Sequence, residues 1–99
     1  SRGLGDVYKR QTYIDTYAWI LFIKGKYAEA KLYMDRVLVG DIENDEEVSG
    51  GVLEHAGDIY AQCGDMEGAL KYWKMAQEKG GDVSQLLKKK IQLKKYIEE

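Results

Sequence analysis

The sequence predicts an all-α fold of two helix pairs followed by a final helix, and two observations carry this prediction. Apolar residues recur at i, i+3, i+4 and i+7 along most of the chain, the spacing of one face of a helix. Glycines interrupt the spacing, and the pattern of the first half of the chain returns in the second half. We therefore expect five helices and no strand within 99 residues, which are enough for one small domain.

Composition narrows the classes of protein that the chain fits. Fifteen basic and seventeen acidic side chains give a net charge of −2, without the basic excess that binding to nucleic-acid phosphates requires. We expect no nucleic-acid partner. The single cysteine, Cys63, excludes a disulfide framework and a multi-cysteine metal site. The longest uncharged apolar stretch, residues 16–23, is far shorter than the roughly 20 residues that span a bilayer, so we expect no membrane insertion.

Residues 1–11 differ in character from the rest of the chain. The segment 4–11, Leu-Gly-Asp-Val-Tyr-Lys-Arg-Gln, resembles a translated sequencing adaptor and has no apolar core of a secretory signal. We interpret residues 1–11 as a non-native or disordered extension; the alternative is a natural extension with Val7 and Tyr8 as weak anchors. The first interpretation leaves the compartment open between the cytoplasm and a periplasmic or membrane-associated location.

The first helix pair is predicted over residues 12–43. Its first helix begins at Thr12, which forms a capping box with Asp15, and stops at Gly25. Its second helix ends at Gly40, because glycine readily takes the left-handed conformation that closes helices. About three residues join the two helices, so they must be antiparallel neighbours. Their apolar stripes are Ile14, Tyr17, Ala18 and Leu21, then Tyr27, Ala30, Met34, Val37 and Leu38.

An acidic tract over residues 41–51 is predicted to be an exposed loop. Five of its first seven residues are carboxylates, and it closes with Ser-Gly-Gly. It lacks the alternating acids and central glycine of a calcium loop, so a solvated loop is favoured over a cation site. The chain has no proline, and we expect Gly40, Gly50 and Gly51 to make the turns here.

A second helix pair is predicted over residues 50–81, with a break at Gly64 and an end at Gly80. A last helix is predicted over residues 83–99. Five lysines surround its apolar side, as expected of a capping helix whose outer face is solvated. The apolar stripes are Leu53, Ala56, Gly57 and Tyr60, then Met66, Ala69, Leu70, Trp73 and Ala76, and finally Val83, Leu86, Leu87 and Ile91.

The two helix pairs are copies of one repeat. Aligning Gly25 with Gly64 superimposes Ala18 on Gly57, Leu21 on Tyr60, Tyr27 on Met66, Ala30 on Ala69, Met34 on Trp73 and Val37 on Ala76. The small residues let the helices approach closely, and the turn glycine permits a tight reversal. With this order of small and aromatic positions the chain resembles the tetratricopeptide repeat (TPR) family. The resemblance implies an α-solenoid of two TPR helix pairs plus a C-terminal capping helix.

Two features depart from the TPR pattern. The glycines are 39 residues apart, so five residues are inserted relative to the 34-residue repeat, and they fall in the acidic loop. The proline that often closes a repeat is replaced by Ile42 and Gly81. With its lysine-rich last helix the chain is also similar to the C-terminal end of long bacterial multi-repeat proteins, many of them lipoproteins. We therefore expect a fragment of such a protein.

The first helix is apolar nearly all round, because Trp19, Ile20, Phe22 and Ile23 add to its stripe. A helix that is apolar on both faces needs cover on both faces. Stacked repeats bury their faces against neighbours, so a preceding repeat is the expected cover, and self-association through this open N-terminal face is the other way to supply it.

The resemblance implies a groove lined by the first helix of each pair. Its positions are Thr12, Asp15, Trp19, Phe22 and Ile23 in repeat one, and Glu54, His55, Asp58, Ala61 and Gln62 in repeat two. A groove that is aromatic at one end and acidic at the other fits a peptide with an apolar anchor and basic character. The alternative for Trp19 and Phe22 is packing against a neighbouring repeat.

No pattern in the sequence predicts an enzyme. His55 with Asp58 at i, i+3 suggests a metal or acid–base pair only weakly, because a metal needs three or more ligands and the chain has one histidine. Cys63 lies about 12 Å from His55 along a helix axis, too far for a nucleophile and its base. We expect no cofactor and no metal. The predicted function is a protein-interaction scaffold that binds a peptide or partner protein; the alternative is an accessory or regulatory segment of a longer enzyme chain.

Overall fold

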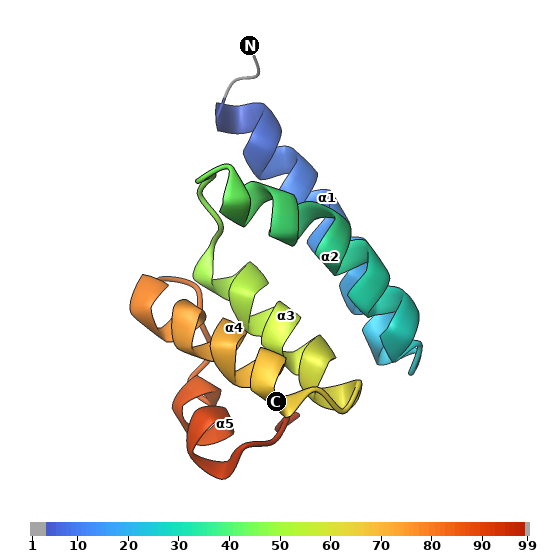
Figure 1. Ribbon diagram of the computed structural model, residues 1–99, viewed down its shortest axis with the longest axis vertical. Coiled ribbons are helices and arrows are strands. Elements are labelled where there is room, and N and C mark those ends of the chain that lie inside the picture. Colours follow the sequence, from blue (N-terminus) through green and yellow to red (C-terminus); the bar gives the residue numbers. More distant parts are fainter. Residues whose placement is uncertain (1–3, 99) are drawn as a thin grey trace. The chain divides into compact units, whose positions relative to one another are not determined.

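The computed structural model describes residues 4–98, with side chains from residue 9 onward, and this part of the chain is all α-helical. The predicted all-α fold is confirmed, and each predicted helix has a counterpart. The helices are α1 (Leu4–Ile23), α2 (Tyr27–Glu43), α3 (Gly50–Gln62), α4 (Met66–Lys79) and α5 (Leu87–Leu93), as Figure 1 shows. The chain divides into two compact units, Ser1–Val48 and Ser49–Glu99, which are described separately below.

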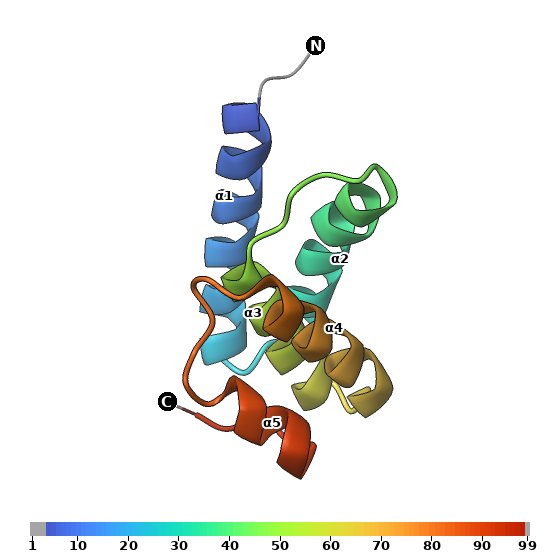
Figure 2. The same cartoon turned by 90° about the vertical axis from the view of Figure 1, so that its left-hand side faces the viewer.

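Unit 1 (Ser1–Val48) consists of the antiparallel helices α1 and α2. Gly25 makes the turn between them at a φ of 80°, which a residue with a side chain rarely adopts. Ala18 of α1 and Ala30 of α2 are completely buried, as their small size in the repeat pattern predicted. The N-terminal turns of α1 extend past the end of α2 (Figures 1 and 2).

The first helix begins at Leu4, so its predicted start at Thr12 is wrong. Two side chains just before Thr12 explain why the helix continues toward the N-terminus. Arg10 donates a 2.9 Å bond to Asp41 Oδ1, and Gln11 donates a 2.9 Å bond to Asp41 Oδ2. Gln11 and Asp41 are both buried, at 3% and 5% exposed. Residues 4–11 belong to α1 and residues 1–3 lie outside the described residues, so the interpretation of residues 1–11 as a non-native or disordered extension stays a prediction.

The loop between α2 and α3 covers residues 44–49 and is shorter than the predicted 41–51. Gly40 does not end α2, which continues to Glu43, and Gly50 and Gly51 form the first turn of α3. A Cβ at Gly50 would overlap the Gly80 carbonyl oxygen. The Gly-Gly pair is therefore required for close packing of the α3 start and not for a turn.

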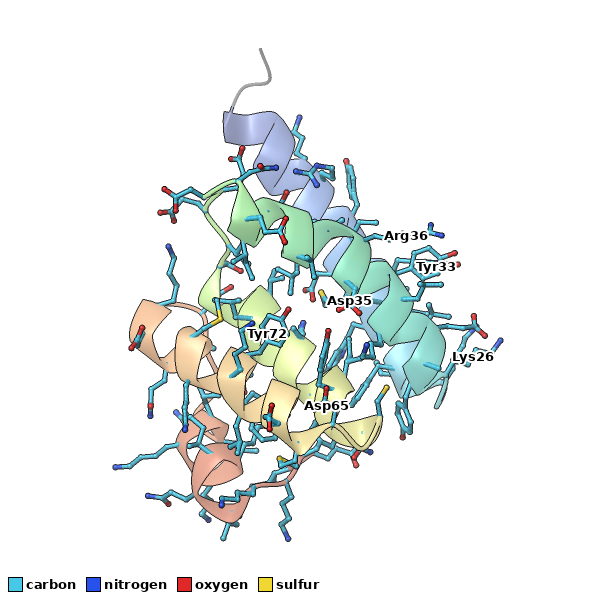
Figure 3. All side chains as sticks on the ribbon, in the orientation of Figure 1. Lys26, Tyr33, Asp35, Arg36, Asp65 and Tyr72 are labelled. Carbon is cyan, nitrogen blue, oxygen red and sulfur yellow. The ribbon has the colours of Figure 1, made fainter. Side chains whose placement is uncertain are left out.

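Unit 2 (Ser49–Glu99) is built on the antiparallel helices α3 and α4, which turn at Gly64 with a φ of 86°. Ser49 caps α3 by accepting a bond from the Val52 amide, and Asp65 caps α4 at the position labelled in Figure 3. The fully buried apolar side chains are Ala56, Ile59, Ala69, Trp73 and Ala76. Gly57 faces Trp73 so closely that a Cβ would overlap the indole ring. The predicted role of a small residue at position 57 is confirmed.

The last helix is shorter than predicted, because α5 covers only Leu87–Leu93 of residues 83–99. Asp82 and Ser84, which precede this helix in the chain, bind α3. Asp82 accepts a 2.7 Å bond from the Gly51 amide, and the Ser84 amide donates a 2.7 Å bond to Glu54. Residues 83–86 remain outside the helix, and the side chains of Asp82 and Ser84 are bound to α3.

Candidate functional site

Large apolar side chains remain exposed along one face of α1. Tyr13 and Ile23 are 71% and 72% exposed, and Tyr17 and Ile20 are 47% exposed. Spacings of four, three and three residues place them in one stripe, which we call the α1 apolar face. Tyr17 was predicted to pack with the buried stripe, which is wrong, since it is 47% exposed and packs in a T-shaped pair with Tyr33 of α2, at a centroid distance of 4.8 Å.

The aromatic end of the predicted groove is largely part of the core of unit 1. Trp19 and Phe22 stack with their ring centroids 4.5 Å apart, and Phe22 also packs against Tyr27 at 5.2 Å. Phe22 is buried within its own helix pair, and Trp19 and Asp15 are half-buried, so packing against a neighbouring repeat stays a prediction. Thr12 and Ile23 of this group are exposed, and Ile23 belongs to the α1 apolar face.

The surface of α2 beside Tyr33 is polar. Arg36 lies over the Tyr33 ring at 5.3 Å, and Asp35 pairs with Lys31 one turn away at 3.1 Å. Figure 3 labels Tyr33, Asp35 and Arg36 on this helix. Leu32 and Val39 of α2 are also exposed, at 54% and 44%, but the larger group of exposed apolar side chains in the described part of unit 1 lies on α1.

The acidic end of the predicted groove is buried around a lysine. Glu54 and Asp58, one turn apart on α3, are 4% and 2% exposed. The Lys90 ammonium of α5 lies 2.8 Å from Glu54 Oε2 and 2.9 and 3.1 Å from the two Asp58 oxygens. The indole N–H of Trp73 donates to Asp58 Oδ1 at 3.0 Å. We call Glu54, Asp58, Trp73 and Lys90 the buried lysine cluster.

Ser84 completes the attachment of the C-terminal segment, residues 82–98, to α3. Its amide and hydroxyl both donate to the Glu54 carboxylate, and its hydroxyl oxygen accepts a 3.2 Å bond from the Leu86 amide. The Tyr96 ring lies 5.5 Å from the Lys90 ammonium. The two groove carboxylates are therefore satisfied by the chain's own C-terminal segment and are covered by it.

Burial and hydrogen bonding act in opposite directions on the two carboxylates. Desolvation raises the pKa of Asp58 to about 6 even though Lys90 and Trp73 act to lower it. Desolvation also acts to raise the pKa of Glu54, but the hydrogen bonds from Lys90 and Ser84 outweigh it, so that pKa lies below the ordinary value of 4.5. At neutral pH both groups are ionised around one ammonium.

We expect Trp73 fluorescence to titrate with a midpoint near pH 6, because the carboxylate that accepts its indole N–H titrates there. Asp58 binds its proton more tightly in the folded chain than in the unfolded chain. Its contribution to the free energy of unfolding is therefore fully present below about pH 4 and is lost as the pH rises through about 6. A fluorescence titration of Trp73 in a Trp19→Phe background measures the pH of this midpoint.

Asp58→Asn in the same background is the control for this titration, because an amide accepts the indole bond but does not titrate. A transition near pH 6 that persists in Asp58→Asn would assign the titration to another group. The contribution of Glu54 to the free energy of unfolding depends on pH in the opposite direction, because it is lost as the pH falls below about 4.5. The effects of the two carboxyl groups therefore fall in different pH ranges.

The remaining predicted site residues do not converge. His55 is half-buried on α3, Gln62 is exposed at the end of that helix, and Cys63 follows it with an exposed side chain. Among the residues with described side chains, no three His, Cys, Asp or Glu groups gather as a metal site would require. None of the helices in residues 4–98 is both long and apolar enough to cross a bilayer.

Three residues of this site, Lys90, Trp73 and Ser84, were not predicted from the sequence. A signal for Lys90 was present, since it lies three residues after the buried Leu87 and thus on the same side of the helix. A lysine on the packed side of a short helix needs a buried acceptor. The i, i+4 spacing of Glu54 and Asp58 supplies two on one helix face.

No protein-family model, curated protein or solved structure matches this chain. Its class is therefore defined by its own fold and site. It is an all-α protein of packed helix pairs, with an exposed apolar face on α1 in unit 1 and a buried lysine cluster in unit 2.

Proposed function

We propose that the chain is a helical-repeat interaction scaffold of the TPR type that binds a helix of a partner protein on the α1 apolar face. The single observation that carries the proposal is the exposure of Tyr13, Tyr17, Ile20 and Ile23 on one side of α1. A contiguous apolar patch of this kind marks an interaction site on a folded protein.

The equivalence of the two helix pairs supports the repeat class. Gly25 and Gly64 both turn at positive φ between the helices of their pair. The aligned alanines Ala30 and Ala69 are both completely buried, and the aligned large residues Met34 and Trp73 are at most 1% exposed. Repeats of this kind present their unburied faces to other protein segments.

The chemistry of the α1 apolar face fits an amphipathic helix. Its side chains follow the i, i+3, i+4 spacing through which two helices pack ridges into grooves. Lys9 and Lys24 are exposed and lie on the same side as Tyr13, Tyr17 and Ile20, one at each end of the stripe. A partner helix with an apolar stripe and acidic residues at both ends is therefore complementary in shape and charge.

The test compares wild type with Tyr17→Lys/Ile20→Glu and with Leu93→Lys. Leu93 is a matched control, because this apolar residue of α5 is 55% exposed but lies in unit 2. Proteins retained by the immobilised chain are purified and their Kd measured. We expect the double variant to bind a retained partner at least about tenfold more weakly, a loss of about 1.4 kcal/mol or more, and Leu93→Lys to bind like wild type.

Two results would contradict this proposal. Equal binding by all three chains would remove the α1 apolar face as the binding surface. Light scattering that shows a wild-type dimer, and a monomer for the double variant alone, would assign the face to a second copy of the chain instead of a partner helix.

A further inference from the structure

The buried lysine cluster is shaped around an ammonium group. Three carboxylate oxygens lie 2.8, 2.9 and 3.1 Å from Lys90 Nζ, and an ammonium has three N–H donors. Lys90 itself is only 2% exposed, so its charge is balanced by Glu54 and Asp58 and not by water. Two buried carboxylates one turn apart repel each other, so this face of α3 requires a cation when it is covered.

The segment that brings Lys90 to α3 has few other attachments. Among residues 84–98, only Leu87 and Lys90 are buried, whereas Lys88, Lys89 and Leu93 are exposed. The α5 helix has seven residues, too few to be stable by itself. The polar contacts of Asp82, Ser84 and Lys90 and the one buried leucine hold this segment on the rest of unit 2.

The connection to α4 is suited to release of the segment. Gly80 and Gly81 both have positive φ, at 70° and 79°, and no atom lies within 4 Å of a Cβ built at either. Two adjacent glycines give the connection backbone freedom, so the segment can leave without disturbing α4 once the Gly80 carbonyl separates from Gly50. Segments with few buried apolar contacts open at lower free energy than the core.

We propose that the C-terminal segment is an intramolecular ligand of α3, and that it excludes a lysine-bearing segment of a partner from Glu54 and Asp58. The residues of the segment that contact the rest of unit 2 include Ser84, Leu87 and Lys90. A competing partner segment is therefore expected to carry a hydroxyl residue, an apolar residue and a lysine at intervals of three. The inference rests on the proposed function for the existence of a partner. The ammonium recognition on which it depends is tested in the chain alone.

The first experiment replaces the lysine by a free amine. Lys90→Ala removes Cγ, Cδ, Cε and Nζ, the heavy atoms of n-propylammonium. We expect this amine to raise the Tm of Lys90→Ala by about 4 °C or more and to leave wild type unchanged. Tetramethylammonium at the same ionic strength is the control, because it has the charge without an N–H donor.

Equal shifts with the two ions, or an equal shift in wild type, would overturn ammonium recognition. Should Lys90→Ala be unfolded without amine, recovery of helical circular dichroism with n-propylammonium supports the proposal, and no recovery overturns it. Lys90→Ala/Asp58→Asn lacks one carboxylate, and we expect it to respond less than Lys90→Ala.

The second experiment supplies the segment in trans. A labelled peptide of residues 82–98 is titrated into Lys90→Ala, beside the same peptide with Lys90→Gln. We expect the lysine peptide to bind at least about tenfold more tightly than the glutamine peptide, the ratio for one charge-assisted buried contact. Wild type should bind the lysine peptide more weakly, because its tethered segment competes at an effective concentration in the millimolar range.

Two results would overturn the claim that a second lysine competes with Lys90 for Glu54 and Asp58. One is equal binding of the two peptides by Lys90→Ala, and the other is equal binding of the lysine peptide by wild type and Lys90→Ala. These outcomes are independent of the α1 apolar face. Tyr17→Lys/Ile20→Glu is expected to give the same amine and peptide results as wild type, so a failure here is distinguishable from a failure of the proposed function.

Discussion

Lys90→Met is expected to lower the free energy of unfolding of unit 2 by about 3–5 kcal/mol, the cost of removing one partner from a buried ion pair. The variant would leave Glu54 and Asp58 buried, one turn apart and without a cation. Denaturant unfolding followed by Trp73 fluorescence measures the loss, because Trp73 is fully buried and bonded to Asp58.

Lys89→Met is the matched control for this prediction, since Lys89 is the exposed neighbour on the same short helix. We expect its effect to stay within about 0.5 kcal/mol of wild type, as for ordinary surface substitutions. The triple variant Lys90→Met/Glu54→Gln/Asp58→Asn is expected to recover most of the loss, because it removes all the buried charges together. Equal midpoints for Lys90→Met and Lys89→Met would show that the cluster contributes little to stability.

Gly57→Ala is expected to destabilise unit 2 by about 1–3 kcal/mol, the usual cost of overpacking a core. The added Cβ would overlap the indole of Trp73, which is fully enclosed and is also bonded to Asp58. The ring cannot move away without breaking that bond. The gain in helix propensity from Gly to Ala, about 1 kcal/mol, offsets only part of the cost.

Gly40→Ala is the control for this prediction, because Gly40 also lies inside a helix but has no atom within 4 Å of a built Cβ. We expect it to stabilise α2 by about 0.5–1 kcal/mol. Opposite signs for the two substitutions separate close packing from backbone entropy. A Gly57→Ala variant as stable as Gly40→Ala would mean that the helices separate at little cost.

The helix pairs were predictable from sequence because their signals are local. Spacing of apolar residues fixed the faces of α3 and α4, and the paired small residues such as Gly57 and Ala69 indicated where these helices touch. The turn glycines Gly25 and Gly64 were found because each stands alone between two periodic segments. None of these inferences needed residues far apart in the chain.

Helix ends were predicted less well, because distant contacts decided them. Asp41 was assigned to a loop on the basis of its acidic neighbours, but Arg10 and Gln11, 31 and 30 residues away, bury it within α2. The last helix was predicted to start at residue 83, but Asp82 and Ser84 bind Gly51 and Glu54 of α3, and the helix begins at Leu87. A residue able to cap a helix can be recognised by its type, but the sequence does not show which helix it binds.

The site was predicted only in part for the same reason. Glu54 and Asp58 were identified as an acidic helix face, and the lysine that covers them was assigned to a solvated helix. Lys90 is 32 residues from Asp58 and 36 from Glu54. A periodic pattern carries no information about a pairing at that separation, and a lysine is solvated more often than it is buried.

The buried lysine cluster also constrains how sequences related to this chain can vary. Loss of Lys90 alone leaves two buried carboxylates without a cation, and loss of Asp58 alone leaves the Trp73 indole N–H without its acceptor. Replacing all the charged members together leaves no such orphan. Among relatives of this chain, Glu54, Asp58 and Lys90 should therefore be present together or absent together, whereas Lys88 and Lys89 should drift independently.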